Sequence, residues 1–112
     1  MNYFFSDNAT PWLDLGGGVS RKIIAYTPEL MGVVVRFQKG SIGTPHSHEI
    51  HNQISYVAAG SFEATIDGQK KTLRVGDAYI APKQIVHGVV ALEDGSILVD
   101  MFSPRRDDFL GK

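Results

Sequence analysis

The sequence predicts an all-β fold in a single domain. Twelve glycines and five prolines divide its 112 residues into short apolar runs, several of which alternate apolar with polar side chains. Alternation with a period of two is typical of strands with one buried face, and Gly and Pro between the runs are typical of tight turns. No run has the length and period of a confident helix. About nine short strands at turn spacings of roughly ten residues predict a sandwich or barrel.

The first eighteen residues look irregular, although residues 3–5 and 12–15 could each form a short strand or an apolar strap. Three consecutive glycines at residues 16–18 then make a flexible break. From there, apolar alternation and turn residues define the remaining elements. Strands are expected, in chain order, at residues 19–26, 31–38, 44–50, 53–59, 62–67, 71–75, 78–81, 87–92 and 96–103.

Individual turn residues set the ends of these strands. Pro45 favours a strand start or a sheet edge, because proline has no N–H to donate to a neighbouring strand. Asp67-Gly68 lies between two alternating runs and predicts a hairpin with a type I′ turn. Pro82 ends the strand at 78–81, and Pro104 ends the last strand and leaves residues 105–110 as a tail.

Charge and composition limit the classes of function. Eleven basic and 12 acidic residues give a net charge of −1, so there is no electrostatic reason to expect nucleic acid or an anionic membrane as a partner. The chain has no cysteine, which excludes disulfides, thiolate metal sites and cysteine nucleophiles. The start of the sequence lacks the regions of a signal peptide, and no apolar run approaches the ~20 residues that span a bilayer. We therefore expect a cytoplasmic protein.

Residues 40–60 contain three of the four histidines. His46 and His48 have the spacing that puts two imidazoles on one face of a strand. Gln53 opens the next predicted strand and His87 opens a later one, so all four side chains could converge at the mouth of a barrel as ligands of one divalent transition metal, with positions left open for substrate. The alternative is that the histidines are ordinary core residues. His51 should point to the other face, as a supporting or exposed residue.

Gln53 is the informative member of this set, because a neutral ligand leaves a divalent ion at full charge and makes it a stronger Lewis acid. The alternative is that Gln53 does not bind the metal and water takes its place. Three imidazoles suit Zn, Fe, Ni, Cu, Co or Mn, so the residues leave the identity of the metal open.

The last strand carries a candidate for proton transfer. Asp100 shares a strand face with Leu98 and Phe102. Burial among apolar neighbours would raise the pKa of its carboxyl towards the range that suits acid–base chemistry. An edge strand with Asp100 facing solvent is an equal alternative. Arg106 could grip a carboxylate with its two-pronged guanidinium, or could pair with the acidic residues Asp107 and Asp108 that follow it.

Written as patterns, residues 40–60 read G-x5-H-x-H-x4-Q-x6-G and residues 76–87 read G-x5-P-x4-H. This resembles the two signature motifs of the cupin superfamily, with motif 1 at 40–60 and motif 2 at 76–91. The family has glutamate where Gln53 stands, glycine where Gln84 stands and asparagine where Ala91 stands. The resemblance implies a cupin-type double-stranded β-helix (a jelly-roll barrel) that spans residues 1–112.

The end of the chain, from Asp100 to Leu110, is similar to the KdgF family of small single-domain cupins associated with pectin and alginate degradation. That resemblance implies His46, His48, Gln53 and His87 as metal ligands, and Asp100, Phe102 and Arg106 as the substrate-side residues. It implies an enzyme that converts 4,5-unsaturated monouronates, which are small anionic sugars, into the linear ketonised form. A three-histidine cupin dioxygenase and a non-enzymatic metal- or sugar-binding cupin are the rival functions. The aromatic residues 3–5 suggest a contact with a second subunit, and so a homodimer.

Overall fold

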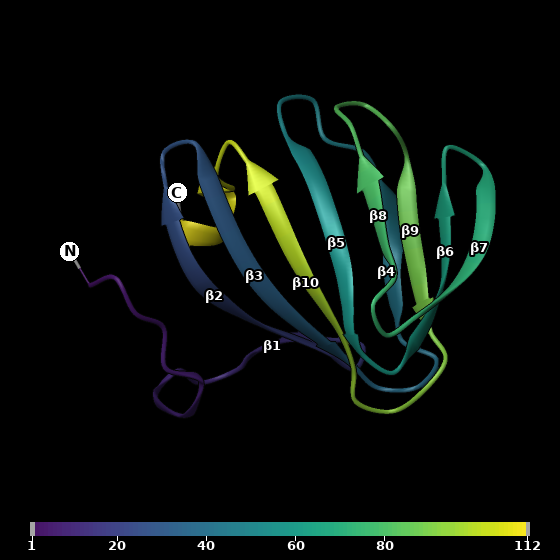
Figure 1. Cartoon of the computed structure of the whole chain (residues 1–112), viewed down its shortest axis with the longest axis horizontal. Coiled ribbons are helices and arrows are strands. Elements are labelled where there is room, and N and C mark those ends of the chain that lie inside the picture. Colours follow the sequence, from purple (N-terminus) through teal and green to yellow (C-terminus); the bar gives the residue numbers. More distant parts are fainter. Residues whose placement is uncertain (1, 112) are drawn as a thin grey trace.

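The structure is a computed structural model that describes residues 2–111, and its strands form two antiparallel sheets (Figure 1). The six-stranded sheet has the order β1 (Leu13–Gly16), β2 (Val19–Thr27), β3 (Leu30–Phe37), β10 (Ser96–Ser103), β5 (Asn52–Ala59) and β8 (Ala78–Ala81). The four-stranded sheet has the order β4 (Ile42–His46), β9 (His87–Ala91), β6 (Ser61–Ile66) and β7 (Gln69–Arg74). Two 3-10 helices, η1 (Asp7–Ala9) and η2 (Asp107–Leu110), complete the elements. The predicted all-β class is confirmed.

The core lies between the inner faces of the two sheets. Met31, Val33, Val35 and Phe37 are all buried on one face of β3, as their alternation predicted. From the opposite sheet Phe62 packs its ring edge-on against Phe37, with centroids 5.1 Å apart. Such pairs add to the gain from apolar burial. Beside this core, His46 is the last residue of β4, Gln53 is the second residue of β5 and His87 is the first residue of β9. The core therefore positions the strand ends that carry these polar side chains.

Local turn chemistry confirms some predictions and corrects others. Asp67 and Gly68 both have positive φ, of 51° and 76°, as the predicted type I′ hairpin between β6 and β7 requires. Pro45 lies in β4, which is an edge strand of its sheet. β4 ends at His46, however, so residues 47–50 do not continue the strand. Residues 13–16 form a strand, whereas residues 3–5 do not.

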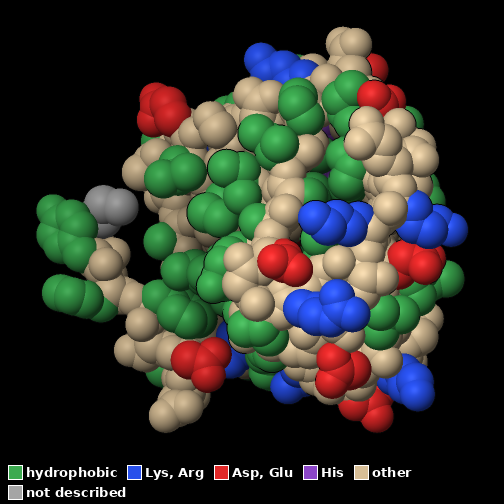
Figure 2. Space-filling view, turned by 45° about the vertical axis from the view of Figure 1, so that its right-hand side comes forward, with side chains coloured by type: hydrophobic (Ala, Val, Ile, Leu, Met, Phe, Trp, Pro, Cys, Tyr) green, Lys and Arg blue, Asp and Glu red, His purple; other side chains and the backbone are tan. Residues whose placement is uncertain are grey.

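On the face in Figure 2, Lys and Arg side chains lie interspersed with Asp and Glu side chains, so this face carries no extended patch of one sign. Tyr3 and Phe4 are 81% and 82% exposed. No helix within residues 2–111 has the length and apolar character needed to cross a membrane.

Candidate metal centre

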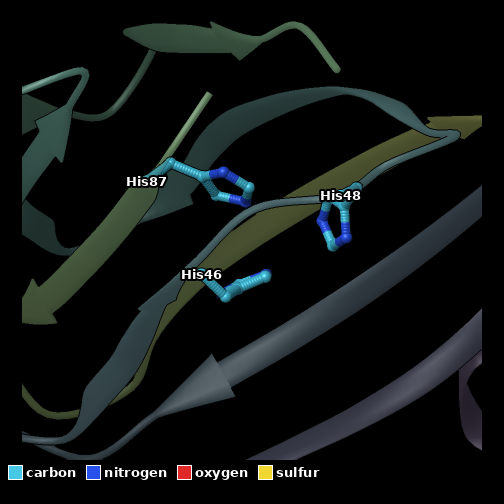
Figure 3. Close-up of side chains that lie close together, drawn as sticks. All are labelled: His46, His48 and His87. Atoms are coloured by element: carbon cyan, nitrogen blue, oxygen red, sulfur yellow. The ribbon is translucent and has the colours of Figure 1, made fainter. Parts of the chain in front are cut away.

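Three of the predicted ligands form one cluster. The ligand nitrogens of His46, His48 and His87 lie within 4.8 Å of one another, and Figure 3 shows the three rings grouped together, two from one stretch of chain and the third from another. His46 is the last residue of β4 and His87 the first of β9, and the two residues are direct cross-strand partners. The edge of one sheet thus brings together histidines 41 positions apart in the sequence. A cluster of this kind could bind a metal ion.

His48 reaches the cluster in a different way from the one predicted. It does not share a strand face with His46, because β4 ends at His46 and His48 lies in the connection that follows. Its backbone carbonyl accepts a hydrogen bond of 2.6 Å from the N–H of Gln84. Gln84 has a positive φ of 69°, a conformation that glycine adopts without strain. A tight turn before β9 therefore positions the second histidine.

Hydrogen bonds to the backbone orient two of the rings. Nδ1 of His46 donates to the carbonyl of Thr44 at 2.7 Å, and Nδ1 of His87 donates to the carbonyl of Ile85 at 3.0 Å. A carbonyl oxygen only accepts, so in the neutral rings Nε2 keeps its lone pair. Burial lowers the pKa of His48 to about 4 and also lowers that of His87. Both rings are therefore neutral at pH 7, which is the form that binds metals.

Gln53 faces the same cluster. Its Nε2 donates to Ser55 Oγ at 2.9 Å, and Ser55 Oγ donates to Asp100 Oδ1 at 2.6 Å. Because the carboxylate accepts, this relay fixes the amide with Oε1 towards the histidines, 3.0 Å from His48 Nε2 and 3.1 Å from His87 Nε2. The lone pair of His87 Nε2 thus meets another acceptor. A cation between the two satisfies both, so the donor set fits a divalent transition metal.

Asp100 lies at the centre of the six-stranded sheet. Its cross-strand partners are Val33 of β3 and Ser55 of β5, so the alternative of an edge strand with a solvent-facing carboxylate is wrong. Burial raises the pKa of its carboxyl to about 6, against the opposing effects of the Ser55 hydrogen bond and the positive charge of Arg106. A carboxyl group in this range can take up or give a proton near neutral pH.

The predicted substrate-side residues share one cavity with the cluster. A cavity of about 400 Å³ is lined by His46, Gln53, Asp100, Phe102 and Arg106, together with residues of β2, β3 and η2. Phe102 is buried and its ring meets that of His48 edge-on, with centroids 5.8 Å apart. The volume is within the range of sites that hold small ligands. A carboxyl group, a guanidinium and two candidate metal ligands, His46 and Gln53, thus surround one space.

Arg106 has a local ion pair as well. Its Nε and Nη2 donate to the two carboxylate oxygens of Asp108 at 2.9 and 2.7 Å, so the predicted alternative of a pair within the tail is present. The same guanidinium lies over the ring of Phe109, with Cζ 4.2 Å from the centroid. His51 is buried outside the three-histidine cluster, and its Nε2 donates to the carbonyl of Arg105 at 3.0 Å. His51 therefore supports the tail that carries Arg106.

Three residues of the site were not expected from the sequence. Ser55 orients Gln53 and Asp100, while Arg21 and Phe109 line the cavity. Ser55 lies two residues after Gln53 on β5, so the period of the strand places both side chains on the same inward face. That spacing could have identified Ser55 as a neighbour of Gln53. Arg21 interrupts the inward-facing row of Val19 and Ile23 on β2 in the same way.

Comparison with known proteins agrees with this geometry. The family described as Cupin domain matches residues 33–101. The chain is 59% identical over 110 residues to the pectin degradation protein KdgF of Dickeya dadantii, covering 98% of this chain and 100% of that protein. The structure of KdgF from Halomonas sp. superposes with a TM-score of 0.95 at 50% identity, covering 97% of this chain and 99% of the other. An RmlC-like cupin from Shewanella frigidimarina gives a TM-score of 0.92 at 40% identity, covering 97% and 96%. The chain belongs to the cupin superfamily and, within it, to the KdgF family.

Proposed function

We propose that this protein converts 4,5-unsaturated monouronates, the products of pectin or alginate lyases, into the linear ketonised sugar by ring opening and tautomerisation. One observation carries the proposal: His46 of the histidine cluster, the Asp100 carboxyl and the Arg106 guanidinium line a single cavity of about 400 Å³. The near full-length similarity to a protein named for pectin degradation supports the same class of substrate.

The reaction is an isomerisation that needs proton transfer and charge stabilisation. Loss of the proton from the anomeric hydroxyl breaks the bond between C1 and the ring oxygen and gives an aldehyde at C1. The electrons of that bond stay on the ring oxygen, which becomes an enolate at C5. A proton delivered to C4 then turns the enolate into a ketone. The atoms balance without an oxidant, a reductant or a second substrate.

Asp100 is the proposed proton-transfer residue, as base at the anomeric hydroxyl or as acid at C4. Its carboxyl, with a pKa raised to about 6 by burial, lies at the cavity wall and is oriented by the hydroxyl of Ser55. An environment that raises the pKa of a carboxylic acid towards the working pH favours both directions of proton transfer.

The remaining proposed roles follow from charge. His46, His48, His87 and Gln53 would hold the divalent metal, which would act as a Lewis acid towards substrate oxygens. All four ligands are neutral, so the site keeps its full positive charge for an anionic sugar. Arg106 holds the uronate carboxylate, and Phe102 forms the apolar wall beside it.

The test is the ultraviolet absorbance of the C4=C5 double bond during incubation of 4,5-unsaturated galacturonate with the purified protein. We expect the absorbance to fall in proportion to protein concentration, with no consumption of oxygen, and the linear ketone to accumulate in NMR spectra. A His46→Ala/His87→Ala variant is the matched control and should be inactive. Oxygen uptake would instead indicate the dioxygenase, and binding without turnover would indicate a sugar-binding cupin.

A further inference from the structure

Arg21 is a charged residue in an apolar row. It lies on β2 between Val19 and Ile23, which pack against the core from the same face. Its cross-strand partner on β3 is the buried Val35. The Arg21 side chain lines the same cavity of about 400 Å³ as His46, Gln53 and Asp100. A guanidinium therefore stands where the pattern of the strand calls for an apolar side chain.

The Arg21 guanidinium has a buried N–H group, that of Nε, which makes no hydrogen bond. Arg21 takes part in none of the ion pairs found within residues 2–111, whereas Arg106 is paired with Asp108. The Cζ atom of Arg21 lies 3.7 Å from the centroid of the Phe109 ring, and that of Arg106 lies 4.2 Å from the same centroid. Two guanidiniums thus share one aromatic ring, one with a carboxylate partner and one without.

This arrangement is unfavourable for the protein alone. Burial and the positive charge of Arg106 lower the pKa of Arg21, against the smaller opposing effect of the Asp108 carboxylate, yet a guanidinium stays protonated in proteins. A partly buried charge with an unmade hydrogen bond destabilises a fold. Such a departure from the local pattern is typical of a position that serves a ligand. The ligand needed here carries negative charge and planar acceptors.

We propose that Arg21 is a specificity-determining residue that binds the carboxylate of the sugar acid beside Arg106. The identity of the ligand rests on the proposed function. A carboxylate matches the planar fork of a guanidinium, and Arg21 needs no rearrangement of an existing ion pair to accept one. Arg106 must first share or release Asp108. Arg21 therefore makes the first anionic contact, and the net positive charge of the pair selects acids over neutral sugars.

The test compares two probes, D-galacturonate and D-galactose, which differ only in the oxidation of C6. Isothermal titration calorimetry of the metal-loaded wild type should give tighter binding of the acid. Arg21→Met keeps the stem that packs on Phe109 and removes the charge. It should weaken galacturonate binding on the order of 10- to 100-fold, leave galactose binding unchanged and leave the melting temperature equal or higher. Arg21→Lys should restore part of the preference for the acid.

Arg74→Met, on the exposed face of β7 away from the cavity, is the matched control and should bind both probes as the wild type does. Arg21→Gln gives the same comparison if the Met variant does not fold. Equal loss for both probes, unchanged galacturonate binding, or no preference for the acid in the wild type would each overturn the inference. Turnover of the unsaturated sugar is measured separately: a wild type that binds galacturonate through Arg21 without turnover refutes the proposed reaction and leaves this inference standing.

Discussion

Replacing Asp100 with asparagine removes one ionisable proton and keeps the shape of the side chain. The amide oxygen still accepts the hydrogen bond from Ser55 Oγ, which is 2.6 Å long in the wild type. Burial raises the pKa of the Asp100 carboxyl from its usual 3.8 to about 6. That difference corresponds to about 3 kcal/mol by which ionised Asp100 destabilises the folded protein.

The pH dependence of stability follows from the direction of the shift. Because the pKa is raised on folding, the favourable contribution of protonated Asp100 is complete below pH 3.8 and is lost as the pH rises through about 6. Metal-free Asp100→Asn and wild type should therefore have similar free energies of unfolding near pH 4. At pH 8 the variant should be more stable by up to about 3 kcal/mol. Urea unfolding of chelator-treated protein measures the difference.

The opposite titration of His48 cancels in this comparison. Burial lowers the pKa of His48 from 6.5 to about 4, so its contribution to stability is present above pH 6.5 and is lost as the pH falls. Both proteins carry His48, and the difference between them isolates Asp100. A difference in stability that does not change with pH would refute the idea that the carboxyl is desolvated.

Activity gives the second half of the Asp100 test. The loss of the proton-transfer group should lower kcat by roughly 10²-fold or more, with the metal content unchanged. Asp67→Asn is the control, because Asp67 lies in the β6–β7 hairpin and Asn-Gly is equally suited to its type I′ turn. A metal-loaded Asp100→Asn enzyme with wild-type turnover would refute the role in proton transfer.

Three further substitutions test other parts of the site. Gln84→Gly should raise stability by about 1 kcal/mol in thermal unfolding, because φ at this position is 69°; a lower melting temperature would contradict the strain. Gln53→Glu should tighten metal binding in a titration but slow turnover and move the pH profile upward, because the added charge favours protonated Asp100; unchanged kinetics would count against the neutral-ligand argument. Arg106→Lys should raise KM about tenfold for the acid sugar, and an effect on kcat alone would oppose a binding role.

Most of the fold was predictable from the sequence, because the patterns that indicate strands and turns involve residues close together in the chain. Alternation along β3 predicted a buried face, and Asp67-Gly68 predicted the hairpin, since each depends on residues adjacent in the chain. His46 and His48 lie close together as predicted, but the expected reason, a shared strand face, was wrong. The strand ends at His46, and a hydrogen bond from Gln84, 36 positions after His48, sets the path of the connection. Such long-range contacts leave no period in the sequence.

Two site residues could have been recognised from the alternation of their strands, although neither was predicted as a site residue. Arg21 and Ser55 each occupy an inward-facing position among apolar neighbours, and a polar residue there requires a partner. The identity of that partner depends on strand order. Ser55 lies beside Asp100 because β10 runs between β3 and β5, an arrangement of strands distant in the sequence. The ion pair of Arg106 with Asp108, in contrast, was predictable as an alternative from proximity in the chain.

In the proposed function, the His–Gln site and the cavity beside it open an unsaturated uronate in a metal-dependent reaction. Turnover of 4,5-unsaturated galacturonate should be compared among metal-loaded, chelator-treated and reconstituted protein, with metal content measured in each sample. We expect loss of turnover in parallel with loss of metal, and return of turnover on reconstitution with one divalent ion per chain. Full turnover by protein shown to be free of metal would contradict the proposed metal dependence.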